Sequence, residues 1–375
     1  MTLKKLDEIS LEKLRTKAKE RTVRTQNIEY TPEMIIKRVN SGEIKLSPDY
    51  QRNHRWDNKT SSRLIESMIL NIPIPLIYLS QDIDLDDETG EGISRYSIID
   101  GQQRLTAIRN FFTNTFPLTK LETFKELNGY YFKDLPDFLI RRLEDRGIKF
   151  LRIDSTLDPE LKYYIFEKLN RGSVNLEPQE LRNSIYRGEF NNLLKKLAKY
   201  ENFRKLLKIK DDKNSKVKKM EDIELVLRFF AFGLKENYIN YKNIGLEVFL
   251  SNYMESMNKK VNKMPSLLDN LEKDFYNVMD FIYINFKDKA FVKYNPTKIS
   301  AFNKAVFDAL AIAIYIDVDL ENSLITQNFK DDYKKLFSED KRFMKSIDGA
   351  VASATKVKDR INTLRELLNK HNVSK

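Results

Sequence analysis

Residues 96–112 read Tyr96-Ser97-Ile98-Ile99-Asp100-Gly101-Gln102-Gln103-Arg104-Leu105-Thr106-Ala107-Ile108-Arg109-Asn110-Phe111-Phe112, and this stretch decides the fold. It begins as an apolar run typical of a β-strand and turns sharply at Asp100-Gly101. Beyond the turn, apolar residues recur at helical spacing, namely Leu105, Ile108, Phe111 and Phe112. The stretch therefore predicts a strand that enters a helix through a short turn.

The start of this helix has the composition of an anion site. The first helical N–H groups have no carbonyl partner, and the positive end of the helix dipole lies there. Gly101 lets the backbone approach a ligand, Gln102 and Gln103 add amide donors, and Arg104 adds a planar fork suited to phosphate oxygens. We interpret the turn as a phosphate-binding strand-turn-helix. The alternative is that Asp100 is an ordinary helix N-cap and Arg104 lies on a solvated face.

Two other polar segments are candidates for ligand contact. The segment from Leu46 to Asp57 is too polar for a core element, and loops of this composition are commonly binding surfaces. Within it we assign a functional role to Gln51 and Arg52, and interpret Tyr50 and Trp56 as anchors to the core. Later in the chain, a helix ends at Asn170-Arg171-Gly172-Ser173. Asn170 and Arg171 suit a phosphate or base contact, although a plain helix-loop-helix connection fits this segment nearly as well.

These three segments resemble, in order, the motifs of one family. The word Ile98–Thr106 looks like the DGQQR motif of the GmrSD-type restriction family, whose N-terminal domain belongs to the ParB/sulfiredoxin-like superfamily. Tyr50-Gln51-Arg52, followed by Trp56, resembles the second motif, a loop that faces the DGQQR turn. The third motif matches Phe166–Gly172 together with Leu176, Glu180, Leu181, Arg182 and Tyr186, with Ser173 where the family usually has a second glycine. The resemblance spans roughly residues 25–235 and, more loosely, the helical remainder.

The resemblance implies an α+β, ParB/sulfiredoxin-like N-terminal domain and an all-helical C-terminal domain. It also implies binding and hydrolysis of a nucleoside triphosphate with Mg²⁺, in an antiviral or restriction-type system. The implied roles are catalysis by Asp100, Gln103 and Arg104, with Asp100 also holding the metal. The implied nucleotide-binding residues are Gln51, Arg52, Gly101, Gln102, Asn170 and Arg171. The alternative is a ParB-like DNA-binding adaptor that uses the nucleotide as a switch, and multiple turnover would distinguish the two.

The amino-acid composition excludes several kinds of site and reaction. The chain has no cysteine and only two histidines, His54 and His371, which excludes disulfides, thiolate zinc sites, sulfiredoxin chemistry and histidine metal clusters. Many family members carry a C-terminal His-Asn-His nuclease domain, whereas His371 stands alone in Lys370-His371-Asn372. We therefore expect no nuclease activity from this chain by itself, and we expect a separate nuclease or other defence protein as a partner.

The formal charge of +11 points to an acidic partner, and we expect weak DNA binding. The densest basic run is 204–220, which we interpret as an exposed basic loop or a domain boundary. Its candidate DNA-binding residues are Lys205, Lys208, Lys216, Lys218 and Lys219.

The remaining pattern predicts the domain organisation. Residues 1–24 are an N-terminal extension with a charged helix, 25–210 the nucleotide-binding domain, and 221–375 a helical domain. Within the first domain we expect strands near 23–30, 76–79 and 148–153, a helix capped by Thr31, another capped by Asn58, and a hairpin over 116–132. No apolar run is long enough to span a membrane, so we expect a cytoplasmic protein. The oligomeric state is left open, a homo-oligomer included.

Overall fold

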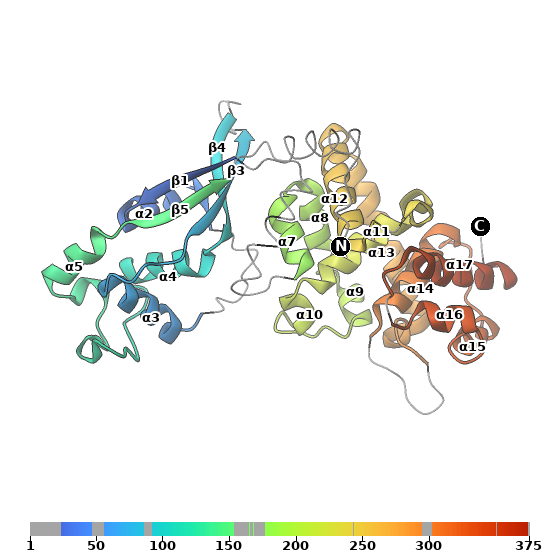
Figure 1. Cartoon of the computed structure of the whole chain (residues 1–375). Helices are drawn as coiled ribbons and strands as arrows, with labels where there is room; N and C mark the ends of the chain where they lie inside the picture. Colours follow the sequence, from blue (N-terminus) through green and yellow to red (C-terminus); the bar gives the residue numbers. More distant parts are fainter. Residues whose placement is uncertain are drawn as a thin grey trace, which may run out of the picture. The chain divides into compact units, whose positions relative to one another are not determined.

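The computed structural model describes residues 24–46, 56–85, 92–153, 177–242, 244–294, 302–349 and 351–373, together with residues 165 and 168. Contacts divide the chain into two compact units, Met1–Leu176 and Glu177–Lys375, which we call the N-terminal unit and the helical unit (Figure 1). The sequence placed the division between 210 and 221. It falls at Leu176 instead, because Leu206, Leu207 and Ile209 are buried in the core of the helical unit.

The described part of the N-terminal unit is built on a five-stranded mixed sheet with strand order β1-β5-β3-β4-β2. The pairs β1–β5 and β3–β4 are antiparallel, whereas β5–β3 and β4–β2 are parallel. The strands are β1 (Thr25–Tyr30), β2 (Ile44–Lys45), β3 (Ile77–Leu85), β4 (Gly92–Asp100) and β5 (Ile148–Ile153). The sequence predicted β1, β4, β5 and the start of β3, but not the short β2.

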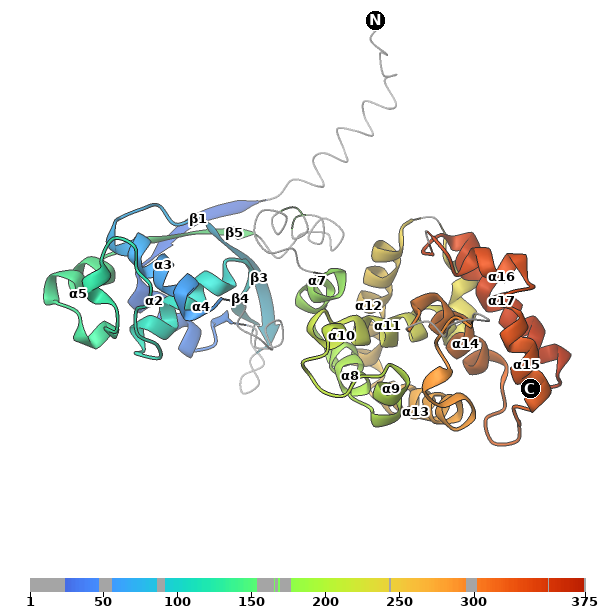
Figure 2. The same cartoon turned by 90° about the horizontal axis from the view of Figure 1, so that it is seen from below.

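Helices cover one face of this sheet (Figure 2). They are α2 (Pro32–Asn40), α3 (Asn58–Ile69), α4 (Gln102–Phe112) and α5 (Asp137–Glu144). Alternate strand residues such as Ile77, Leu79 and Ile98 share a core with Leu105, Ile108 and Phe111 of α4 and with residues of the other three helices. The apolar residues that alternate along the strands and those at helical spacing along α4 therefore pack together in one layer.

Local signals set the helix starts. Thr31 accepts a hydrogen bond from the Met34 amide at the start of α2, as predicted, with Pro32 at the first helical position. The cap of α3 is Asp57 rather than Asn58, because the Asp57 carboxylate accepts the Thr60 amide at 2.7 Å. Our assignment of the cap to Asn58 was one residue late.

The hairpin expected over 116–132 is wrong. Within these residues, all of which the structure describes, no strand forms, and a short 3-10 turn, η2 (Lys125–Leu127), is followed by a second, η3 (Phe132–Asp134). The reason is the buried Glu66 of α3, whose carboxylate accepts backbone N–H groups of Glu122, Thr123 and Phe124 at 2.7–3.2 Å. Burial would raise the pKa of Glu66, but these three hydrogen bonds outweigh it and lower the pKa.

The described part of the helical unit consists of helices and 3-10 turns packed around one large core. The sequence predicted a helical domain at 221–375, and its long helices are α11 (Glu221–Gly233), α12 (Leu246–Lys263), α13 (Leu267–Phe286), α14 (Lys304–Asp317) and α17 (Ala354–Lys370). Shorter helices complete the unit: α7 (Pro178–Ile185), α8 (Glu189–Leu197), α9 (Glu201–Leu206), α10 (Ser215–Lys218), α15 (Gln327–Lys335) and α16 (Lys341–Ser346). The predicted fold class, an α+β region followed by a helical region, is confirmed. Among the described helices, none has the length and apolarity needed to cross a membrane.

Candidate functional site

The predicted strand-turn-helix is present in the N-terminal unit. Strand β4 ends at Asp100, Gly101 turns the chain with φ of 100°, and α4 begins at Gln102. The N-cap is Gly101, which has no side chain, so the alternative in which Asp100 is the N-cap does not hold. The start of α4 carries the positive end of the helix dipole, which favours an anion.

Gly101 is required by its surroundings as well as by its backbone angle. A β-carbon at this position would lie 2.8 Å from Cγ1 of Ile77, the first residue of β3. The register between β3 and β4 is also irregular here, shifting between Tyr78, which pairs with Asp100, and Leu79, which pairs with Ile98. Such irregularities are common where a sheet edge is shaped for function. The close approach to Ile77 fixes the position of the first turn of α4 against the sheet.

Arg104 is buried and its guanidinium is used within the protein. Nη2 donates to Oδ2 of Asp100 at 2.6 Å, and Nη1 donates to the carbonyls of Pro75 and Leu76 at 2.5 and 3.1 Å. Arg104 therefore holds the turn to the segment that leads into β3, which the sequence did not predict. The alternative that places Arg104 on a solvated face is excluded, and its guanidinium has partners other than a ligand.

The two glutamines of the motif lie in the first turn of α4 and are partly exposed. Oε1 of Gln103 is buried and has no hydrogen-bond partner among the described residues. An acceptor in this position costs free energy unless a donor reaches it, about 1–3 kcal/mol for a typical buried polar group. Gln103 is thus a polar group at the start of α4 that a water molecule or a ligand donor could satisfy.

The strand that precedes the second candidate segment in sequence pairs with β4. Strand β2 runs parallel to β4, with Ile44 beside Tyr96 and Lys45 beside Ser97, so both strands leave the sheet in the same direction. Leu46 directly follows β2, and Trp56 lies just before α3, which packs against α4. Gln51 and Arg52 themselves lie outside the described residues, as do Asn170 and Arg171 of the third motif.

A metal site formed by the protein alone is not found in the part of the chain that the structure describes, where no group of three or more His, Cys, Asp or Glu side chains could hold an ion. Asp100 is the single carboxylate of the motif, and it is shared with Arg104. Mg²⁺ commonly takes one or two carboxylates, with substrate phosphates and waters as the remaining ligands. Asp100 offers one such carboxylate.

The predicted DNA-binding lysines lie in, between and directly after two short helices of the helical unit, and all but Lys216 are exposed. Lys205 pairs with Glu201, Lys208 with Asp288 and Lys219 with Glu177, at 2.6, 3.2 and 2.9 Å. Lys216 lies over the ring of Phe302, with Nζ 5.4 Å from the ring centroid, and Lys218 is exposed. The expected loop is present at 207–214, between α9 and α10, and Lys208 lies in it. Lys205 lies in α9, Lys216 and Lys218 lie in α10, and Leu206 and Val217 anchor these two helices in the core.

Comparison with known families agrees with the motifs. Residues 33–187 match the family described as GmrSD restriction endonuclease, N-terminal domain. No curated protein matches the chain. The matched range covers strands β2 to β5, α4 and the start of the helical unit through α7, and leaves out β1.

Proposed function

We propose that this chain, which carries a GmrSD-type restriction-protein N-terminal domain at residues 33–187, binds a nucleoside triphosphate and hydrolyses it in a restriction or defence system. The family supports the restriction or defence role. The binding and hydrolysis of a nucleotide are our inference from the site.

One observation carries the inference: a helix that starts directly after a sheet strand, with Gly101, which has no side chain, as its N-cap. A helix start of this kind is suited to phosphate oxygens. The amides of this turn and the side chains of Gln102 and Gln103 would contact the phosphates. Gln51 and Arg52, on the segment that follows the parallel strand β2, would reach the same ligand, and Asn170 and Arg171 would add contacts.

Arg104 has a different role from the one that its chemistry first indicated. Its ion pair with Asp100 and its two bonds to carbonyls hold the turn in place. We therefore propose that Arg104 positions Asp100 and the start of α4, and that its effect on a phosphate is mainly indirect. Asp100 would hold Mg²⁺, which neutralises phosphate charge and favours attack on the terminal phosphorus when bound.

The same site would also suit a nucleotide-switched adaptor that binds DNA without repeated turnover. The helical unit offers little support for strong DNA binding, because Lys205, Lys208 and Lys219 already have acidic partners. Any DNA contact through this segment would be weak and strongly dependent on salt. Cleavage would then fall to a separate nuclease.

The test is phosphate release by the purified full chain with Mg²⁺ and ATP, GTP, CTP or UTP. We expect many turnovers with at least one of them, and loss of turnover when Gln51 and Arg52 are both replaced by alanine. The matched control replaces Arg24 and Gln26, which are exposed at the start of the sheet, with alanine and should keep wild-type turnover. A single turnover per chain would favour the adaptor, and no binding of any of the four nucleotides would refute the proposal.

A further inference from the structure

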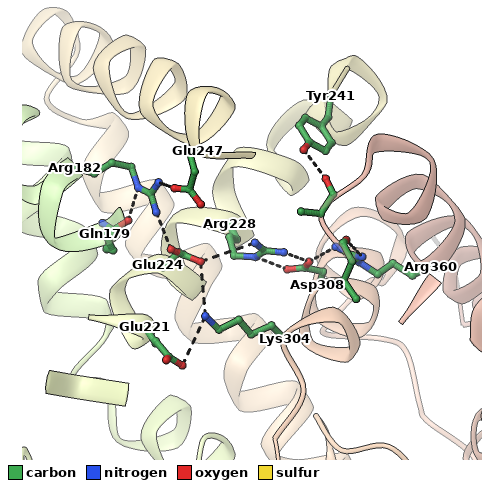
Figure 3. A network of polar contacts seen from close by, with 12 residues as sticks. Gln179, Arg182, Glu221, Glu224, Arg228, Tyr241, Glu247, Lys304, Asp308 and Arg360 are labelled. Atoms are coloured by element: carbon green, nitrogen blue, oxygen red, sulfur yellow. Dashed lines mark hydrogen bonds and ion pairs between the residues drawn. The ribbon is translucent and has the colours of Figure 1, made fainter. Parts of the chain in front are cut away.

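The helical unit holds charged side chains of two kinds. Those of the first kind are mostly buried and form ion pairs from α7 to α17, through Arg182, Glu224, Arg228, Asp308 and Arg360 (Figure 3). Their hydrogen bonds go to one another and to neighbours in the same core, so these side chains serve the packing of the helices. Those of the second kind are exposed lysines, and several of them lie where α9 meets the end of α13.

Two of these lysines approach the ring of Tyr283 on α13. Helix α9 packs against α13 (Figure 2), and Lys205 of α9 places Nζ 5.5 Å from the centre of the Tyr283 ring. Lys287, directly after α13, places Nζ 4.9 Å from the same centre. The electron-rich face of a tyrosine ring attracts an ammonium group. Because the side chain of Tyr283 is partly exposed, two cations and an aromatic ring meet at the surface of the unit.

Two further lysines extend this group. Lys208 follows α9, and its Nζ lies 3.2 Å from Oδ2 of Asp288 in a short 3-10 turn, η5 (Lys287–Lys289), which packs against α9. Lys289 is exposed at the end of the same turn. We call the group the Tyr283 patch, and its members are Lys205, Lys208, Tyr283, Lys287 and Lys289.

The patch carries an excess of positive charge. Lys205 pairs with Glu201, and Lys208 with Asp288, but the two lysine side chains are 46% and 47% exposed. Exposed ion pairs of this kind contribute little to stability, so their lysines can exchange one anion for another at small cost. Lys287 and Lys289 have no ion-pair partner in the part of the chain that the structure describes. Two positive charges are therefore left for a partner molecule.

The backbone of Lys287 is strained. Its φ is 55° and its ψ is −145°, a combination that residues other than glycine rarely adopt. Glycine would relieve the strain at this position, but the chain has a lysine whose ammonium lies over the ring of Tyr283. Strained residues are concentrated at functional sites, because the structure without the strain would be more stable. The strain is thus a second, independent sign that Lys287 has a role other than packing.

An unpaired nucleotide has the chemistry that matches this patch. A base that is not stacked in a helix can lie on an exposed tyrosine ring, and this contact contributes more than one exposed cation–π contact. A base can therefore replace an ammonium group on the ring, and the displaced ammonium finds the adjacent phosphate as its partner. Ile284, the next residue of α13, is 67% exposed and offers an apolar contact beside Tyr283. A double helix presents no free base face to such a ring.

We propose that the Tyr283 patch binds single-stranded nucleic acid, with a base on the ring of Tyr283 and phosphates on Lys205 and Lys287. The inference goes beyond the proposed function, because every residue of the patch belongs to the helical unit and none to the nucleotide site. It takes Lys205 and Lys208 from the basic run 204–220 and joins them to Tyr283 and Lys287. These last two residues are distant in sequence, so the basic run by itself does not indicate them.

The experiment measures the binding of a fluorescent oligothymidylate of about 16 nucleotides to the full chain by fluorescence anisotropy, without Mg²⁺ or free nucleotide. A DNA duplex of the same length is the second probe. At about 0.15 M salt we expect the single strand to bind at least about fivefold more tightly than the duplex. Equal or tighter binding of the duplex would refute the inference, and so would the absence of single-strand binding. The proposed function would stand in either case.

Two substitutions of Tyr283 test the contact with a base. Tyr283→Leu keeps an apolar side chain against the core but removes the ring, so affinity for the oligothymidylate should fall about tenfold. Tyr283→Phe keeps the ring and should bind within about twofold of the wild type. If Tyr283→Leu binds as tightly as the wild type, the ring does not carry a base and the inference is wrong.

Lys287→Gly separates a binding role from a structural one. Glycine adopts the angles of Lys287 without strain, so thermal unfolding should show a variant that is no less stable than the wild type. The loss of one phosphate contact should lower the slope of log affinity against log salt by about 0.7. The matched control, Lys259→Met, removes a 72% exposed lysine of α12 and should keep the wild-type slope. An unchanged slope in Lys287→Gly, or an equal change in Lys259→Met, would show that binding comes from the general positive charge of the chain and would overturn the inference.

Discussion

Arg104 of the N-terminal unit and Arg182 of the helical unit are both buried and both paired with acidic side chains, but they find their partners in different ways. Arg104 binds Asp100, four positions earlier on the same strand-turn-helix, and two backbone carbonyls. Arg182 binds Glu224 and Glu247, which lie on other helices far along the chain. The first arginine shapes a turn, and the second fixes the packing of whole helices.

The surroundings separate the two regions further. Arg104 is buried in the first turn of α4, whereas Gln102 and Gln103 in the same turn are partly exposed. A ligand could therefore reach this turn. The ion pairs from Arg182 to Asp308 lie in the interior of the helical unit. A buried arginine by itself does not mark a ligand site, and the polar groups that remain accessible beside it decide its role.

The largest effect on stability should come from the helical unit. Replacing Asp308 with alanine would leave both Arg228 and Arg360 without their shared carboxylate, and breaking a buried pair typically costs about 3–5 kcal/mol. Urea unfolding should show this loss, whereas Asp331→Ala, which removes a carboxylate from an exposed pair with Lys334, should change stability by less than about 1 kcal/mol. If Asp308→Ala and Asp331→Ala lowered the free energy of unfolding equally, the buried ion pairs of Asp308 would not be a main source of stability in the helical unit.

Arg104→Met should have a smaller effect, about 2–3 kcal/mol, because it removes hydrogen bonds from Asp100 and from two carbonyls of one local turn. We also expect nucleotide affinity to fall more than about tenfold, since the turn loses its support. Unfolding measurements and calorimetry on the same variant would separate the loss of stability from the loss of nucleotide affinity. Weaker binding without any loss of stability would show that Arg104 contacts the ligand directly, and unchanged binding would show that the phosphate site lies elsewhere.

Gly101→Ala should lower the free energy of unfolding less than Arg104→Met does. Its structural effect should be confined to the turn before α4. The substitution forces an alanine to φ of 100° and places its β-carbon 2.8 Å from Cγ1 of Ile77, which together cost about 1–3 kcal/mol. Gly129→Ala is the matched control, because Gly129 has φ of 92° but nothing within 4 Å of its β-carbon. Thermal unfolding of the two variants separates the backbone term from the clash, and equal losses would mean that the approach to Ile77 imposes no constraint.

The same contrast explains what the sequence could predict. The strand, the turn at Gly101 and the helix are encoded by neighbouring residues, so the pattern over 96–112 predicted them, and the family motifs pointed to a candidate site there. The partners of Arg104 at Pro75 and Leu76 depend on how β3 joins the sheet, and no local signal indicates that. The short strand β2 and the anchoring of residues 122–124 by Glu66 were missed for the same reason.

The limit of prediction from sequence is clearer in the helical unit. Helical periodicity predicted its long helices, because each buries one apolar face. The pairing of Arg182 with Glu224, or of Arg360 with Asp308, joins residues whose separation in sequence carries no regular pattern. In a chain with this many charged residues, only the folded arrangement distinguishes a buried ion pair from a solvated one.

The most direct test of the central claim, that the start of α4 binds phosphate, is calorimetry of the Gln102→Glu variant with a Mg²⁺-nucleoside triphosphate that binds the wild type. Glutamate is nearly the same shape as glutamine and favours the first turn of a helix, so the variant should be at least as stable as the wild type. Its negative charge would oppose the phosphates, and we expect binding to be weaker by more than about tenfold. Asn110→Asp, the same change of charge near the other end of α4, should bind as the wild type does. Equal affinity of Gln102→Glu and the wild type would contradict the claim.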